Sequence, residues 1–446
     1  MVSMRWEALL DLHRLHDGNY RQAAQRAAYD QDADRITFSA PFRRLANKTQ
    51  VHPLYDNDHV HHRLIHSLET ASVGRTLGLR VGEWLWKNAH IEERNQAVVA
   101  GLVYAACLAH DIGNPPFGHS GEAAIGAWFA ECFARGEGLF SDRHACFAEE
   151  FEAFEGNAQG FRILTRLEMY REDGGMRLTQ GMLGTFVKYP VTARTRLQAR
   201  DACGLKKFGL FQSDAATFAT VAGATGLLPR QDAGGASWWC RHPLVFLVEA
   251  ADDICYNILD LEDAFLCRDL TFGGVEALLS AVSGKKDYAS GNTPQENVAY
   301  LRARAISAAI GACVEAFTEN YDAIMRGEFA GALVDVSAQA ENFRRIEETA
   351  RERIFTSARK TELEVSGRNV VHRVLDGVLP VYEALAACDW DAGKLKGYER
   401  QLERALAIDL RNARDPFSAL HSLADFVSGM TDRYSLKIAR MVTGAS

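Results

Sequence analysis

His110 and Asp111 are an adjacent imidazole and carboxylate in the string LAHDIGNPPFGHSGE. The apolar stretch before them predicts a helix, and Gly113 with the following proline pair predicts that it ends there. At a helix terminus two successive side chains can converge on one ion, whereas inside a helix they point about 100° apart. An imidazole and a carboxylate suit Mn, Fe, Co, Ni or Zn, and carboxylate and water positions also admit Mg. The pair is therefore a candidate metal site.

Two further side chains can complete a ligand set. His66 lies beside Leu64 and Leu68 on the stripe that helical spacing predicts to face inward, where a core histidine is the alternative. Asp252 lies in a helical stretch too apolar for an unpaired carboxylate, and a structural salt bridge is the alternative there. With His110 and Asp111 they form a two-His, two-Asp set that leaves positions for water and phosphate oxygens.

The elements that must position these residues are mostly helices. The clearest helical patterns cover residues 63–88, 95–111 and 243–265, with Pro243 suited to a first turn. Others cover residues 296–325, 338–356, 370–387 and 395–410. Two glycine-rich stretches, residues 174–184 and 222–236, predict loops, with a short hairpin in the first. The sequence therefore predicts a mostly α fold with little β-structure.

The composition excludes some classes of protein but does not identify the function. The 446 residues carry 50 Lys+Arg against 58 Asp+Glu, and the resulting charge of −8 disfavours a protein that mainly coats nucleic acid or membranes. Nine scattered cysteines indicate reduced thiols, and no run approaches the length of an apolar membrane span. We expect a soluble cytoplasmic protein without P-loop or Rossmann nucleotide binding, since neither glycine motif occurs.

Longer strings narrow the family. They are RITFSAPFRRLANKTQV, RLIHSLET, HDIGNPPFGHSGE, FEGNAQGFRILTRLE, FVKYP, EAADDICYNILDLEDA and SGMTDRY. In this order they resemble the deoxyguanosine triphosphate triphosphohydrolase family of HD-domain metal phosphohydrolases. The resemblance implies an HD-domain helical core at residues 31–270, after an N-terminal helical segment at 1–30. A C-terminal helical region at 271–446 is expected to pack on that core.

The resemblance also implies a metal site and a sugar site. The implied metal ligands are His66, His110, Asp111 and Asp252, and the implied ion is Mn²⁺ or Mg²⁺, with Fe, Co, Ni or Zn open. Asp252 is preferred to Asp253 because Tyr256 and Asp260 follow it at one and two helical turns, on the same face. In the family the Tyr256 ring packs under the deoxyribose and Asp260 accepts its 3′-hydroxyl.

The implied reaction is attack of water on the α-phosphorus of dGTP, and of other dNTPs if selectivity is broad. It releases a deoxynucleoside and inorganic triphosphate. His119 is the expected proton-transfer residue, at the leaving oxygen or at the nucleophile, with Glu122 orienting it. The residues expected to bind the rest of the substrate are Gln50, Arg63, Asn157, Lys188 and Tyr189.

The expected partners are the dNTP substrate and further copies of this chain, as a hexamer or tetramer. A dNTP activator and single-stranded DNA as a regulator stay open, and no membrane partner is expected. Arg43, Arg44 and Lys48 form a further basic group, for which oligomer or regulatory-nucleotide contacts and a solvated face are equal alternatives. The histidine run at residues 59–62 has no assignment.

Two other functions stay open. Another HD-domain phosphohydrolase, acting on nucleotide monophosphates, cyclic nucleotides or guanosine tetraphosphate, would keep the metal ligands but lack the Tyr256 and Asp260 pair. A catalytically silent nucleotide sensor or single-stranded nucleic acid binder would be expected to lose His119 or a metal ligand. The sequence retains all of these residues.

Overall fold

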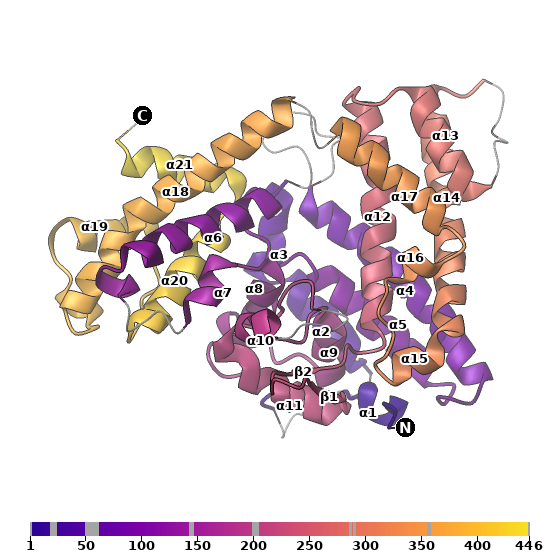
Figure 1. Ribbon diagram of the computed structural model, residues 1–446, viewed down its shortest axis with the longest axis horizontal. Helices are drawn as coiled ribbons and strands as arrows, with labels where there is room; N and C mark the ends of the chain where they lie inside the picture. The colour runs from indigo at the N-terminus through magenta and orange to yellow at the C-terminus, as the bar shows by residue number, and fades with distance from the viewer. Residues whose placement is uncertain are drawn as a thin grey trace.

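The computed structural model describes residues 2–17, 25–49, 62–141, 147–198, 205–284, 288, 291–354 and 358–444. Within these ranges the protein is mostly α-helical, as the sequence predicts (Figure 1). The only sheet there is the antiparallel hairpin of β1 (Pro229–Gln231) and β2 (Ser237–Trp239). The expected position of the hairpin was wrong, because the first glycine-rich stretch instead contains helix α9 (Gln180–Phe186).

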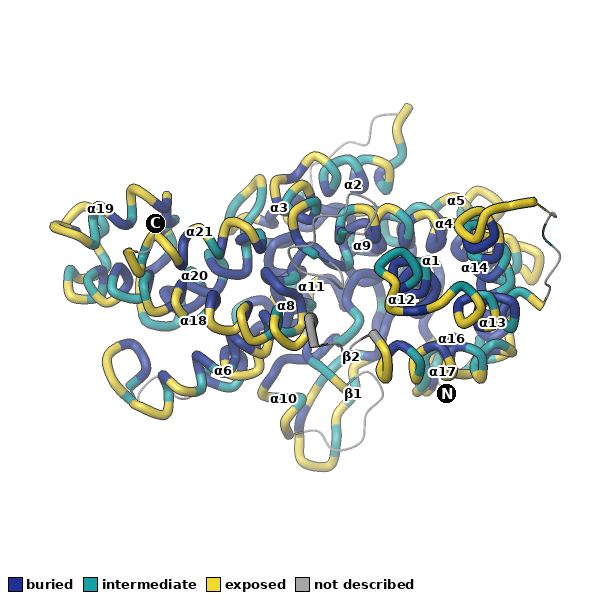
Figure 2. The backbone as a smooth tube through the Cα atoms, turned by 90° about the horizontal axis from the view of Figure 1, so that it is seen from above, coloured by how far each residue is buried: buried dark blue, intermediate teal, exposed yellow. Residues whose placement is uncertain are grey.

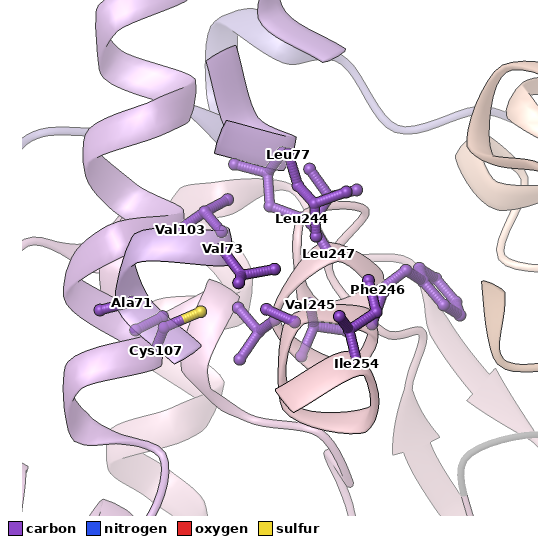
Figure 3. Packing of buried hydrophobic residues seen from close by; sticks show 14 of the residues in the cluster. Ala71, Val73, Leu77, Val103, Cys107, Leu244, Val245, Phe246, Leu247 and Ile254 are labelled. Carbon is purple, nitrogen blue, oxygen red and sulfur yellow. The ribbon is translucent and has the colours of Figure 1, made fainter. Parts of the chain in front are cut away.

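Three long helices form the centre of the fold: α4 (Arg63–Lys87), α5 (Asn95–Ala109) and α12 (Val245–Leu266). Each lies where the apolar spacing predicts a helix. Pro243, however, precedes the N-cap residue Leu244 and so lies outside the first turn of α12. The apolar side chains of the three helices interdigitate in one buried cluster (Figure 3).

Close packing of α4 on α5 depends on glycines. A Cβ atom on Gly74 would lie 2.4 Å from the Cys107 Sγ atom, and one on Gly78 would lie 2.8 Å from the Cα atom of Ala100. The pairing is antiparallel, so the first turn of α4 lies beside the end of α5. Leu68, expected on the inward stripe, is 42% exposed, because the core face of α4 is the one that carries the glycines.

The segments that cover these helices come from the N-terminal part of the chain, from its middle and from the stretch directly after α12. The N-terminal ones are α1 (Trp6–Leu9), α2 (Ala28–Thr37), α3 (Ala40–Arg44) and η1 (Leu45–Asn47). The middle ones are α8 (Gly156–Arg162), η4 (Ile163–Leu167), η5 (Gln212–Asp214) and α11 (Ala215–Thr225), whereas α10 (Ala193–Gln198) contributes Ala193 to a second buried cluster. Those after α12 are α13 (Phe272–Ser283), α14 (Pro294–Glu319), α15 (Tyr321–Met325), α16 (Leu333–Val336), α17 (Ala340–Thr349) and η6 (Ala350–Ile354). The single helix expected over 296–325 is thus broken at Asn320.

A second buried cluster is built by helices distant in sequence. They are α6 (Gly118–Arg135), η2 (Gly138–Phe140), α7 (Ala148–Glu152), α18 (Ala358–Ala387), η7 (Ala392–Lys394), α19 (Gly397–Leu406), α20 (Pro416–Ser428) and α21 (Asp432–Val442). Figure 1 shows this group on the left and the α4, α12 and α14 group on the right. Helix α18 begins earlier, and α19 is shorter, than the apolar spacing predicts. Figure 2 shows buried backbone continuing through the middle of the molecule.

None of the described helices combines the length and the apolarity needed to span a bilayer. The described cysteines are all free, which agrees with the reduced thiols expected from their spacing.

Candidate metal centre and active site

A polar cavity of about 370 Å³ lies where the central helices α4, α5 and α12 meet the helices of the second buried cluster. Most of the residues expected at the site line it: Arg63, His66, His110, Asp111, His119, Glu122, Asn157, Lys188, Tyr189, Asp252 and Tyr256. Asp260 does not line the cavity and is buried two turns beyond Asp252 on α12. Gln50 and His59 to His61 lie outside the described residues.

His66, His110 and Asp111 form a compact trio on one wall of the cavity. One ligand atom from each lies within 4.8 Å of the others, and the two imidazole centroids are 5.1 Å apart. The trio arises because α4 and α5 pack closely in antiparallel orientation, placing the first turn of one beside the end of the other. These three residues could hold one metal ion.

Asp252 reaches the trio from α12. Its Oδ1 atom lies 3.1 Å from His66 Nε2 and 3.4 Å from His110 Nε2, while Oδ2 accepts a hydrogen bond from Lys188 Nζ at 2.7 Å. Burial raises the pKa of Asp252, but the Lys188 ammonium and the His110 ring lower it more, so its pKa lies well below its usual range. Asp252 is therefore an anion held between a cation and two imidazoles.

Asp111 is held from two sides. Its Oδ2 atom accepts a hydrogen bond from Arg63 Nη1 at 2.7 Å, and its Oδ1 atom accepts one from the Asn114 amide. Burial raises the pKa of Asp111, but Arg63 and the two imidazoles lower it further, to about 2. The carboxylate is therefore charged at neutral pH and oriented for ligation.

His110 shows whether these residues suit a metal. Its Nδ1 atom lies 2.7 Å from the carbonyl oxygen of Cys107, which fixes Nδ1 as the hydrogen-bond donor. Its buried Nε2 atom has no hydrogen-bond partner among the described residues and faces Asp252. Burial lowers the pKa of His110, but Asp111 and Asp252 raise it more, so the surroundings favour positive charge at this point. A divalent ion on Nε2 would satisfy both features, and the donor set therefore fits a metal.

His119 and Glu122 lie on α6, one turn apart, at the mouth of the cavity. His119 Nδ1 lies 2.7 Å from Glu122 Oε2, and Glu122 Oε1 accepts the Gly156 backbone N–H at 2.8 Å. The His119 side chain is 81% exposed, whereas that of Glu122 is 10% exposed. Burial raises the pKa of Glu122, but the His119 hydrogen bond and Lys207 lower it more. A charged, fixed carboxylate thus orients an accessible imidazole.

Lys207 and Asn114 line the cavity but were missed in the sequence. Lys207 Nζ lies 3.1 Å from Glu155 Oε1 and 3.9 Å from Glu122 Oε2, and Glu155 also accepts a hydrogen bond from Asn157 at 2.7 Å. The signal for Asn114 was present in the string HDIGNPP, but Lys207 lies in no string that pointed to chemistry.

The other residues that line the cavity are of two kinds, charged side chains and tyrosines. Arg63, Lys188 and Lys207 bring positive charge near the trio, whereas Glu249 and Asp253 add carboxylates beside Lys188. Tyr256 lines the cavity one turn after Asp252, and burial followed by the charge of Asp260 raises its pKa, so its hydroxyl stays neutral. Tyr189 also lines the wall, and burial raises its pKa. The cavity thus presents both a cationic and an aromatic surface.

Lys48 corrects one expectation. The solvated-face alternative is wrong for this residue, since Lys48 is only 3% exposed, and its Nζ atom donates to the carbonyl oxygens of Asn114 and Ser428. Arg43, in contrast, is exposed.

Comparison with known proteins gives the family. The HD domain model matches residues 63–168, the segment that carries His66, His110, Asp111, His119 and Glu122. The protein is 40% identical to a deoxyguanosinetriphosphate triphosphohydrolase-like protein of Pseudomonas aeruginosa, over 99% of each chain. A relative of the same name from Synechocystis sp. is 37% identical over 99% of this chain and 100% of its own. The deoxyguanosinetriphosphate triphosphohydrolase of Klebsiella pneumoniae is 29% identical, over 91% of this chain and 92% of its own. This chain therefore belongs to the deoxyguanosinetriphosphate triphosphohydrolase family of HD-domain proteins.

Proposed function

We propose that the protein is a metal-dependent deoxynucleoside triphosphate triphosphohydrolase that acts on dGTP. The observation that carries this proposal is one cavity in which the His66, His110 and Asp111 trio faces the same space as the His119 and Glu122 pair. A phosphoryl-transfer site needs both cationic groups and a proton-transfer residue, and this cavity supplies them. The names of the relatives agree with this activity.

We propose His66, His110, Asp111 and Asp252 as the metal ligands, with Mn²⁺ or Mg²⁺ as the ion. A bound divalent ion polarises a phosphoryl oxygen and lowers the pKa of a bound water. Asp111 and Asp252 supply the negative charge that an ion in this position requires. Arg63 and Lys188 hold those two carboxylates and add positive charge beside the phosphate groups.

In the proposed reaction, a water oxygen forms a bond to the α-phosphorus and the bond from that phosphorus to O5′ breaks. The O5′ oxygen leaves with the electron pair and takes a proton, giving a deoxynucleoside and inorganic triphosphate. His119 transfers a proton, at the leaving oxygen or at the attacking water, and Glu122 keeps its ring directed into the cavity. Lys188, Lys207 and Tyr189 bind the phosphate chain.

Selection of the sugar is assigned to Tyr256 and Asp260. The Tyr256 ring on the cavity wall would pack under the deoxyribose, where an added 2′-hydroxyl would clash. Asp260 is the proposed acceptor for the 3′-hydroxyl; it is buried and is not one of the described residues that line the cavity. Asn157 and Gln50 complete the proposed substrate contacts. We also propose a homo-oligomer, a hexamer or tetramer, in the cytoplasm.

The test is to incubate the protein with each of the four dNTPs, singly and mixed, with Mn²⁺ or Mg²⁺, and to separate the products by chromatography. Release of inorganic triphosphate and a deoxynucleoside supports the proposal, and the rates with single nucleotides measure selectivity. Pyrophosphate or diphosphate products, or no turnover in any mixture, would contradict it. Turnover of nucleotide monophosphates or cyclic nucleotides instead would favour another HD-domain phosphohydrolase.

A second measurement separates metal binding from turnover. Adding Mn²⁺ to metal-free protein should raise its unfolding temperature, because binding to the folded state alone contributes about 2.7 kcal/mol at a hundredfold excess over Kd. His110→Ala should lose most of this shift. An equal shift in the wild type and the variant would place the ion elsewhere.

A further inference from the structure

The C-terminal string SGMTDRY has no role in the reaction described above, yet its aspartate reaches the active-site loop. Asp432 is the first residue of α21 and is 1% exposed. Its Oδ1 atom accepts the Phe117 backbone N–H at 3.0 Å, from a residue 315 positions earlier. Its Oδ2 atom accepts the Thr49 backbone N–H at 3.1 Å and the Thr49 hydroxyl at 2.6 Å. One carboxylate therefore joins two segments that both line the cavity.

The loop that Asp432 holds has a backbone that needs support. Phe117 is the N-cap residue of α6, with φ of 64°, and Gly118 follows with φ of 57°. A non-glycine residue in the left-handed region is unfavourable unless its surroundings hold it there. The Phe117 side chain makes no capping hydrogen bond to the first turn of α6, and the residue is held instead by its own backbone N–H, which donates to the Asp432 carboxylate.

A second attachment supports the same loop. Lys48 Nζ donates to the carbonyl oxygen of Asn114 at 2.5 Å and to that of Ser428, the last residue of α20, at 2.8 Å. The Asn114 side chain in turn donates to Asp111. The loop is therefore held at both ends: directly by Asp432 at the start of α6, and at Asn114, beside the candidate metal ligand Asp111, by Lys48, which also binds the end of α20.

The position of His119 depends on this loop. It lies two residues after Phe117, its side chain is mostly exposed, and its ring is held by Glu122 on the same helix. Its direction is thus set by the backbone at the start of α6. A displacement of about 1 Å at a reacting group can cost about 100-fold in rate.

We propose that Asp432 is a positioning residue for the reaction, holding the loop from Asn114 to Gly118 so that His119 faces the metal site. This inference rests on the proposed function. Asp432 does not line the cavity, and it acts through Phe117 and Thr49. Removing its carboxylate would release the loop at Phe117, whereas Lys48 would still hold Asn114 beside Asp111, so the metal ligands would stay in place.

The test compares Asp432→Ala, Asp432→Asn and Thr431→Ala in the full chain. Thr431 caps the same helix by accepting the Tyr434 backbone N–H and does not bind the loop. Thr431→Ala is therefore a matched control for weakening of α21. The readouts are kcat and KM with dGTP and Mn²⁺, bound Mn²⁺, and hydrogen exchange of the peptide that covers residues 112–119.

We expect Asp432→Ala to lower kcat about 100-fold, with KM and bound Mn²⁺ unchanged, and to speed hydrogen exchange in the peptide. Asp432→Asn keeps an oxygen that can accept the Phe117 N–H, so we expect its kcat to be about tenfold higher than that of Asp432→Ala. Thr431→Ala should keep wild-type kcat and exchange.

Equal losses of kcat in Asp432→Ala and Thr431→Ala would show that α21 matters only for stability and would overturn the proposal. Unchanged exchange and unchanged kcat in Asp432→Ala would do the same. If the wild type hydrolyses none of the dNTPs, the proposed function fails, but exchange in residues 112–119 still decides whether Asp432 holds the loop. If the alanine variant does not fold, the comparison of Asp432→Asn with wild type decides in its place, with faster exchange and lower kcat expected.

Discussion

Lys188 and Asp252 form a largely buried ion pair that divides the carboxylate between two tasks. Lys188 Nζ lies 2.7 Å from Oδ2, which leaves Oδ1 facing the imidazoles of His66 and His110. Burial lowers the pKa of Lys188, but the charge of Asp252 raises it more, so the lysine stays charged. The pair therefore places a cation for phosphate and an oxygen for metal side by side.

Asp252→Asn should lower the affinity for Mn²⁺ by at least about 100-fold, because it removes the negative charge that faces both imidazoles. The amide oxygen can still accept from Lys188, so the fold should be kept. Metal content after dialysis and direct titration with Mn²⁺ measure the effect. Asp253→Asn, at the next position of the same helix, is the matched control and should change the affinity far less. Equal effects in the two variants would show that the assignment of Asp252 is wrong.

His119→Ala should lower kcat by about 100- to 10,000-fold while bound Mn²⁺ stays constant, because it removes the proton-transfer group and no metal ligand. Glu122→Gln should cause a smaller loss, since the amide can still hold the ring. Steady-state kinetics with dGTP and metal analysis on the same sample provide both values. His13→Ala, which removes a histidine with a 90% exposed side chain, serves as the control. Full activity in His119→Ala would refute the assignment.

Lys207→Met should raise KM for dGTP about tenfold with a smaller change in kcat, because a charged contact to the phosphate chain is lost. Lys206→Met removes the same charge from the neighbouring, exposed position and should leave KM unchanged. A kinetic comparison over a range of dGTP concentrations separates the two constants. If KM rises equally in both variants, the effect comes from the loss of one positive charge on the protein and not from a contact between Lys207 and the substrate.

His242 should make the protein less stable in mild acid. The buried ring accepts the Leu244 backbone N–H on Nδ1 and lies 3.1 Å from the carbonyl oxygen of Leu9 through Nε2, so it is neutral. Burial lowers its pKa from 6.5 to about 4. Between these two values the unfolded chain binds the proton and the folded protein does not. The free energy of unfolding should therefore fall as pH drops through this window, by up to about 3 kcal/mol.

Urea unfolding at several pH values between 7.5 and 4.5 measures this dependence. His242→Gln should be less stable at pH 7.5 but should lose less stability than the wild type as the pH falls. His13→Gln is the control for replacing a histidine at the surface, since its side chain is 90% exposed. The same slope in His242→Gln as in the wild type would rule out His242 as its source.

Much of the fold can be predicted from the sequence because its signals are local. Helices α4, α5 and α12 lie where apolar residues recur at helical spacing, and α5 ends where Gly113 and two prolines follow. The errors have local causes as well. The break between α14 and α15 at Asn320 leaves the apolar period intact, and the hairpin strands are only three residues long.

The sequence by itself determined which side chains could do chemistry: His66, His110, Asp111, Asp252, His119 and Glu122 were all identified from residue type, spacing and family strings. Only the tertiary structure decided how their charges are held. Contacts such as those of Lys207 with Glu155, Lys48 with Asn114, and Asp432 with the Phe117 amide join segments between 52 and 315 residues apart. No local pattern encodes such contacts, because they exist only once the helices of both buried clusters pack around one cavity.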